Sequence, residues 1–201
     1  MTVTAGDSAA RLSKAYAVDQ VSLTGWSLRT QAATQVHAGR SRQTLRARVG
    51  EHAWLSYLPH ALVPHADADY HGQTVIEMQP SSRVLLAEAL SPGRVAFGEQ
   101  FAFKRVRLDL DVWRESTLIA RERGLVQPDL AIHAAQFGAA MHTAGVYILG
   151  PSEPQLDVAC GDTLVGRTQL ARGGWYVRAV ANRAATLDTL LQRLHKRWDA
   201  S

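Results

Sequence analysis

The chain has 201 residues, of which 46% are hydrophobic. It is therefore long enough to bury a substantial core, and we expect residues 1–201 to form a single domain. The only cysteine, Cys160, excludes an intramolecular disulfide framework and any zinc or iron–sulfur site built from the cysteines of one chain. The sequence has no signal-like start and no apolar run of about 18 residues, which predicts a soluble cytoplasmic protein without a membrane partner.

Basic residues exceed acidic ones, 22 against 18, which raises polyanion or nucleic-acid binding as an alternative function. The clearest basic stripe lies on one side of an extended segment and consists of Arg40, Arg42, Arg46 and Arg48. Elsewhere the charges are mixed, because Arg105 and Arg107 are soon followed by Asp109 and Asp111. Mixed stripes are typical of the solvated face of a strand, so we expect no nucleic-acid partner.

Apolar and polar residues alternate along most of the chain, as they do in half-buried strands. The segments with this pattern are, in chain order, Val21–Arg29, Gln43–Val49, Ala53–Leu58, Gln73–Gln79, Arg83–Leu90, 100–113, Thr117–Arg123, Val146–Leu149 and Trp175–Ala181. Turn residues separate the segments at intervals of about ten residues. We predict a mainly β protein with a sandwich-like or coiled β architecture, and the scarcity of helices argues against parallel βαβ units.

Two segments favour helices, giving about two in all. Near the C-terminus a single apolar stripe with helical spacing is formed by Leu187, Leu190, Leu191, Leu194 and Trp198. The Ala-rich segment Leu130–His142 indicates a second helix, although Gly138 costs about 1 kcal/mol relative to alanine within one.

The most metal-like stretch holds four histidines, His52, His60, His65 and His71, with Asp67 and Asp69 among them. Imidazole and carboxylate ligands suit Ni(II), Zn(II) or Cu(II). The spacing matches no closed metal motif, so partly exposed strand and turn histidines are the alternative. We find no nucleophile elbow and no phosphate-binding glycine loop, and therefore expect no enzyme activity. Metal-dependent hydrolysis at the histidines is a further alternative.

Three blocks carry a resemblance to a known family. They are TQAATQVHAG (30–39), AWLSYLPHALVPHADADY (53–70) and EALSPGRVAFGEQFAF (88–103). In this order and spacing they resemble the urease accessory protein UreD, or UreH, family. Ala5-Gly6-Asp7 and the C-terminal segment GWYVRAV (174–180) support the match, so the resemblance covers nearly the whole chain.

The resemblance implies a β-dominated fold with two helices and a role in urease maturation. It implies a scaffold or chaperone that bridges UreF, and through it the GTPase UreG, to the urease apoprotein. Nickel would pass along an internal polar route, with no cofactor tightly bound. On the matched blocks, the expected residues of this route are Asp7, Glu88 and Glu99, followed by His65, Asp67 and Asp69.

One matched block also carries a structural alternative. An ion pair between Glu99 and Arg94 that fixes the turn of residues 91–98 is as good an interpretation of Glu99 as nickel transit. Within the turn, Gly93 and Gly98 are expected to permit backbone geometry that a Cβ would obstruct, and Pro92 presets the first dihedral angle.

Overall fold

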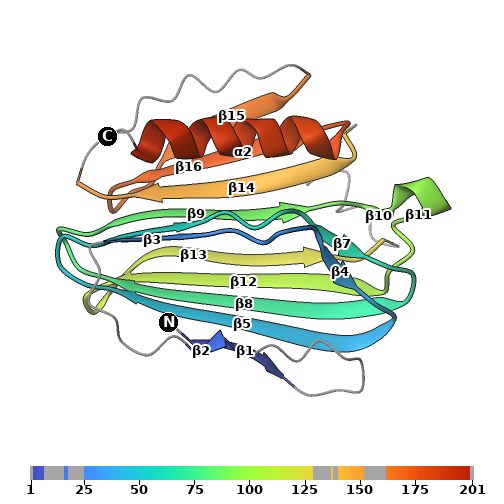
Figure 1. The fold of residues 1–201 in the computed structure, drawn as a ribbon, viewed down its shortest axis with the longest axis horizontal. Coiled ribbons are helices and arrows are strands. Elements are labelled where there is room, and N and C mark those ends of the chain that lie inside the picture. Colours follow the sequence, from blue (N-terminus) through green and yellow to red (C-terminus); the bar gives the residue numbers. More distant parts are fainter. Residues whose placement is uncertain are drawn as a thin grey trace.

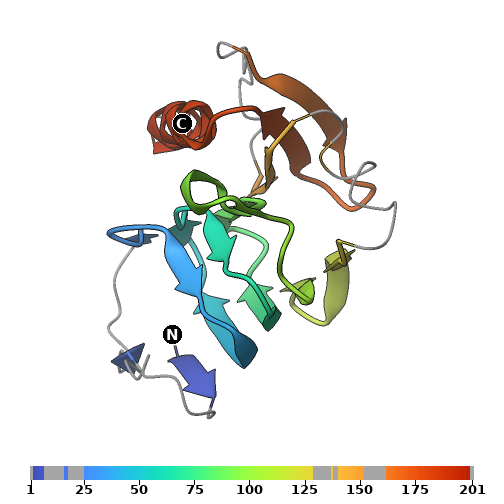
Figure 2. The ribbon, with the colours of Figure 1, turned by 90° about the vertical axis from the view of Figure 1, so that its right-hand side faces the viewer.

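The computed structural model describes residues 2–6, 16–17, 25–128, 137, 140–151 and 162–199. Over this part of the chain the protein is mainly β, as predicted. Two sheets pack face to face, and the helix α2 (Ala184–Asp199) covers the outer face of one of them (Figure 1). Figure 2, turned by 90°, shows α2 end-on beside the strands.

The first sheet has six strands within the described residues. In spatial order they are β13 (Thr117–Val126), β12 (Arg105–Arg114), β8 (Ala68–Met78), β5 (Gly39–Val49), β1 (Thr2–Gly6) and β2 (Tyr16–Ala17). We call this the six-stranded sheet.

The second sheet has eight strands within the described residues, and we call it the eight-stranded sheet. Its main path is β15 (Leu164–Gln169), β16 (Trp175–Ala181), β14 (His142–Leu149), β9 (Arg83–Leu90), β6 (Trp54–Tyr57) and β3 (Gly25–Leu28), with β7 (Leu62–Pro64) also paired to β9 and β4 (Thr34–Val36) to β7. A separate small hairpin consists of β10 (Gly93–Arg94), the 3-10 turn η1 (Val95–Phe97) and β11 (Glu99–Gln100).

The central part of the chain is a coil that alternates between the sheets. After β5 in the six-stranded sheet the chain passes to β6 in the other, returns for β8, crosses to β9 and returns again for β12. The strands that successive turns add to each sheet are therefore parallel. No α-helix connects these parallel strands in the described residues, because the return path is itself a strand of the opposite sheet. The prediction of a coiled β architecture is thus confirmed.

Strand β9 is buried on both faces. Leu85 and Ala87 pack with the leucines of α2, whereas Val84 and Leu86 pack with side chains of the six-stranded sheet. A strand covered on both sides reads as a nearly continuous apolar run, as the sequence RVLLAEAL does. Its one carboxylate, Glu88, is the exception to that run.

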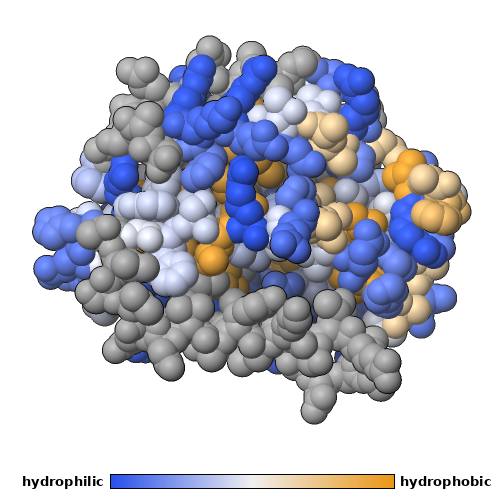
Figure 3. Space-filling model, viewed as in Figure 1, coloured by the Kyte–Doolittle hydropathy of each residue, from blue (hydrophilic) through white to orange (hydrophobic). Residues whose placement is uncertain are grey.

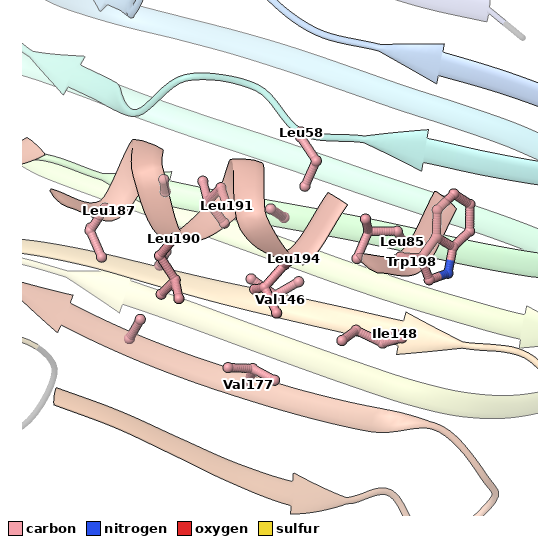
Figure 4. Close-up of a cluster of buried hydrophobic side chains, with 14 of the residues drawn as sticks. Leu58, Leu85, Val146, Ile148, Val177, Leu187, Leu190, Leu191, Leu194 and Trp198 are labelled. Carbon is pink, nitrogen blue, oxygen red and sulfur yellow. The ribbon is translucent and has the colours of Figure 1, made fainter. Parts of the chain in front are cut away.

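The predicted apolar stripe of α2 is confirmed. All five of its residues are buried against the eight-stranded sheet, and Figure 4 shows them facing Leu85, Val146 and Val177. The indole of Trp198 meets that of Trp54 edge to face, with 5.5 Å between the ring centroids. The helix therefore closes the outer side of β9.

The second predicted helix lies mostly outside the described residues. Phe137 is helical, but His142 is the first residue of β14 rather than the end of a helix. His142 is buried, and its Nδ1 lies 2.9 Å from the Ser91 Oγ. Asp7 and Cys160 also lie outside the described residues. Within the described part, no helix has both the length and the apolar character needed to cross a membrane.

Truncating the helix stripe should destabilise the fold. We expect Leu190→Ala, which removes a side chain that is only 1% exposed, to lower the free energy of unfolding by about 3 kcal/mol in urea titrations. The matched control is Gln192→Ala on the exposed face of the same helix, with an expected change below about 0.5 kcal/mol. Equal losses in the two variants would contradict the packing described above.

Candidate functional site

Glu88 lies in the space between the two sheets. Along β9 it alternates with the residues that face α2, so its carboxylate points to the six-stranded sheet between Leu86 and Leu90. From that sheet, the Thr74 hydroxyl donates a hydrogen bond to Glu88 Oε1 over 3.3 Å. The alternation of the strand therefore places a largely buried carboxylate between the two sheets.

Two cavities meet at Glu88. One has a volume of about 60 Å³, and the polar residues of its wall include His60, Gln73 and Thr74. The other has a volume of about 50 Å³ and is lined by Glu122, Thr143 and Arg178 among others. Glu88 and Leu108 belong to the walls of both. Because a water molecule needs roughly 10–15 Å³ of such space, each cavity has room for a few waters beside the carboxylate.

Burial sets the ionisation of Glu88. Removal from water is the main cause that raises its pKa, to about 7, and the negative charge of Glu122 raises it further. The charge of Asp109 acts in the same direction, while the hydrogen bond from Thr74 opposes it. Glu88 therefore exchanges a proton in the neutral pH range instead of being permanently charged.

Tyrosine hydroxyls surround this carboxylate. Burial raises the pKa of Tyr57 to about 12 and also raises the pKa of Tyr70, Tyr147 and Tyr176. At neutral pH these groups are hydrogen-bond donors. The Tyr147 hydroxyl donates to Glu122 Oε2 over 2.6 Å. The surroundings of Glu88 are thus a polar region, rich in oxygen atoms, within the otherwise apolar interior between the sheets.

The turn of residues 91–98 is held by the ion pair that the sequence offered as an alternative. Arg94 binds both carboxylate oxygens of Glu99, with 2.8 Å from Nε to Oε2. This hydrogen bonding, together with one from the Ala66 N–H, lowers the pKa of Glu99. Gly93 and Gly98 have positive φ angles of 133° and 74°, and a Cβ on Gly93 would lie 2.1 Å from the Glu99 carbonyl oxygen. The backbone N–H of Phe101 donates to the carbonyl of Pro92 over 2.6 Å, which closes the turn.

The tip of this turn is apolar and exposed. Phe97 is 75% exposed and Val95 is 40% exposed. The Arg94 guanidinium lies 5.0 Å from the centre of the Phe97 ring. In Figure 3 apolar atoms gather at this end of the molecule, where Figure 1 places η1.

The other predicted route residues are spread over two places. Glu99 Oε2 accepts a hydrogen bond from the Ala66 N–H at 3.2 Å, which puts it beside His65 at one end of the coil. Asp69 is held by Arg105 in two hydrogen bonds of 2.8 and 2.9 Å. Asp67 lies 3.7 Å from Lys104. The structure therefore brings Glu99 and His65 together and leaves Glu88 apart from them.

Neither the surroundings of Glu88 nor those of Glu99 and His65 form a closed metal centre. Among the described residues, no three His, Cys, Asp or Glu side chains come together as possible ligands of one ion. Partial burial, followed by the charges of Arg94 and His37, lowers the pKa of His65.

The basic stripe on β5 is exposed, as expected, but polar side chains of the parallel neighbour β8 lie beside it. Arg48 contacts Glu77 at 2.7 Å, and Arg42 donates to Gln73 at 2.9 Å. These contacts are those of a solvated strand face.

The chain is similar in sequence to proteins of known family. The family model of the UreD urease accessory protein matches residues 16–201. The chain belongs to this family. It is 30% identical over 181 residues to the urease accessory protein UreD 2 of Synechococcus sp. (strain JA-3-3Ab), covering 81% of this chain and 68% of the relative. It is 28% identical over 189 residues to UreD of Actinobacillus pleuropneumoniae serotype 3 (strain JL03), covering 85% and 70%.

Membership of the UreD family also answers the question of catalysis. UreD proteins are accessory proteins without catalytic activity, so the expectation that the chain is not an enzyme is confirmed.

Sequence reasoning missed Glu122 and Tyr147 of this UreD-family chain. A signal was present, because Glu122 alternates on β13 with Ala120 and Gly124 while Arg121 and Arg123 take the opposite face. An acidic residue within an apolar stripe is the same pattern that Glu88 shows on β9. What the pattern could not reveal is that the two strands bring these carboxylates to one cavity.

The raised pKa of Glu88 predicts a pH-dependent stability. Between about pH 4.5 and 7 the folded chain binds a proton at Glu88 that the unfolded chain has lost, so the free energy of unfolding falls as pH rises through this window. The Glu88→Gln variant does not lose stability in this way as pH rises, because the glutamine side chain does not ionise. We expect the variant to be more stable than the wild type at pH 8 by up to about 3 kcal/mol, and equally stable near pH 4.5, in urea unfolding at both pH values.

The matched control for this measurement is Glu51→Gln, which neutralises an exposed glutamate. Its stability should differ from that of the wild type by less than about 0.5 kcal/mol at both pH values. A Glu88→Gln variant whose stability difference from the wild type is the same at pH 4.5 and pH 8 would show that Glu88 has an ordinary pKa.

Proposed function

We propose that this chain is the scaffold that connects UreF and UreG with the urease apoprotein, and that it is required for nickel insertion into urease. Membership of the UreD family supports the connection with urease maturation. The polar interior around Glu88 supports a part in handling the metal itself. Nickel is here a cargo that passes through the chain.

We further propose that Ni(II) passes between the two sheets at Glu88. The support is the position of this carboxylate in the shared wall of two cavities, with Glu122 in the second. Carboxylate, hydroxyl and water oxygens hold Ni(II) less firmly than imidazole or thiolate sites do. A route needs such shallow stops, because an ion that is bound too tightly at one of them does not leave.

The ionisation of Glu88 suits this role. A carboxyl group with a pKa of about 7 is partly neutral at rest, so it carries less unpaired charge in the interior. An arriving cation binds the ionised form and displaces the proton. Passage of the metal is then accompanied by proton release at this residue.

Glu99 and His65, at the end of the coil, form a second proposed stop. Asp7, Asp67 and Asp69 complete the set of proposed transit residues. Asp69 and Glu99 are the weaker of these proposals, because Arg105 and Arg94 each already donate two hydrogen bonds to the respective carboxylate.

The Glu88→Gln variant tests nickel transit separately from the scaffold role. We expect Glu88→Gln to leave the complex with UreF intact and to lower the nickel content of urease several-fold in a co-expression system, because the amide keeps the shape but cannot bind the cation as a carboxylate does. Nickel per urease active site is measured by mass spectrometry after purification, with Glu51→Gln as the control. Full nickel loading by Glu88→Gln would remove this residue from the route.

The scaffold role itself is tested without substitutions. Apo-urease is incubated with UreF, UreG, GTP, bicarbonate and nickel, with and without this chain, and urease activity is followed. We expect activation to depend on the chain, and we expect the chain and UreF to purify together after co-expression. Equal activation in its absence would overturn the proposed function.

A further inference from the structure

Two histidines are placed side by side by the pairing of β4 with β7. These short strands are parallel, and Thr34, Gln35 and Val36 are opposite Leu62, Val63 and Pro64. The next residues in the same register are His37 and His65. The backbone N–H of His65 donates a hydrogen bond to the Val36 carbonyl over 2.8 Å. The backbone therefore fixes the spacing of the two imidazoles.

The His37 and His65 rings are in edge-to-face contact, at a spacing that two ligands of one ion would also have. The centroids of the His37 and His65 rings are 4.6 Å apart, and the ring planes are inclined at 76°. With metal–nitrogen bonds of about 2.1 Å, two imidazoles bound at about 90° to each other have ring centres roughly 4.5 Å apart. The observed spacing matches this value, and His37 and Gln35 are exposed to solvent.

A neighbouring side chain fixes the tautomer of His65. Its Nε2 lies 2.6 Å from the amide oxygen of Gln35. An amide oxygen can only accept, so Nε2 carries the hydrogen and Nδ1 keeps its lone pair. Metal-binding histidines are commonly oriented in this way, with the second ring nitrogen donating to a carbonyl oxygen. Gln35 thus acts as a positioning residue for His65.

A carboxylate partly offsets the basic charge that lies beside the two rings. The nearest basic group, Arg94, is bound to both oxygens of Glu99, and the Glu99 carboxylate lies beside His65. Glu99 offsets this positive charge only in part, because Arg94 lowers the pKa of His65 more than Glu99 raises it.

We propose that His37 and His65 form a two-imidazole site that binds Ni(II) on the surface of this chain, with waters completing the coordination. The identity of the metal rests on the proposed function. A site with only two protein ligands leaves positions open, so an ion bound there can be received from another protein and passed on.

The same pair of strands leads from this site to the interior. Thr34 and Leu62, the first residues of the β4–β7 ladder, line the cavity that Glu88 shares. His37 and His65 lie three residues further along, at about 3.3 Å per residue, or roughly 10 Å from this wall. The two-imidazole site is therefore positioned to load the route at Glu88.

The test is Ni(II) binding by the full chain in the absence of urease. Nickel chloride is titrated calorimetrically into the wild type, His37→Asn, His65→Asn and Gln35→Leu. We expect the affinity of the site to fall at least tenfold in each histidine variant and about tenfold in Gln35→Leu. His52→Asn is the control, since His52 is exposed in a turn with φ of 57°, a conformation that asparagine tolerates. Affinities of the histidine variants equal to that of the control would overturn the proposal.

A second measurement needs no variant. X-ray absorption at the nickel edge of the wild-type chain, loaded with one equivalent, should show two imidazoles per ion, and a spectrum without imidazole would overturn the proposal. Because neither measurement contains urease, their failure leaves the scaffold role intact. Conversely, if the chain binds nickel at this site but urease is activated equally well without the chain, the two-imidazole site is supported and the proposed function is overturned.

Discussion

Burial of β9 on both of its faces is the constraint on which the remaining features depend. The helix α2 covers one face through Leu85 and Ala87, and the six-stranded sheet covers the other. A carboxylate on either face of such a strand is necessarily withdrawn from bulk water, and this is the main cause of the raised pKa of Glu88. If the six-stranded sheet were absent, Glu88 would be an ordinary surface glutamate. The same packing encloses the two cavities that meet at this residue.

The coil explains how residues from separate parts of the sequence meet. Each turn returns the chain to the same sheet after about thirty residues, so parallel neighbours such as Gly39 and Ala68 bring distant segments into register. The pairing of Asp69 with Arg105 and the approach of His37 to His65 follow from this one geometry. In a parallel ladder the backbone hydrogen bonds fix the register, so these contacts do not depend on flexible loops.

Charges on the outside of the six-stranded sheet behave differently from those inside. Burial alone would raise the pKa of Asp109 and Asp111, but hydrogen bonds from neighbouring cations hold both below their usual range. Asp111 is bound by Arg121 and Arg123, with contacts of 2.6 and 2.8 Å. Such exposed pairs contribute about 0–1 kcal/mol each and mainly balance the charge of the surface. Inside, Glu88 forms no ion pair among the described residues, and its charge state responds to pH.

The strand pattern, the apolar stripe of α2 and the family could be predicted from the sequence alone, and the ion pair between Arg94 and Glu99 was one of two interpretations that it offered for Glu99. These features arise from local periodicity or from residues close together in one block. The predicted end of a helix at His142 was wrong, because its pairing with Ala181 of β16 makes this residue the start of a strand. The packing of the strands brings Glu88 and Glu122 to one cavity, keeps Glu99 apart from Glu88, and places His37 against His65. Those relations depend on how strands of different turns pack and register, and the alternation within a single strand carries no information about its neighbours.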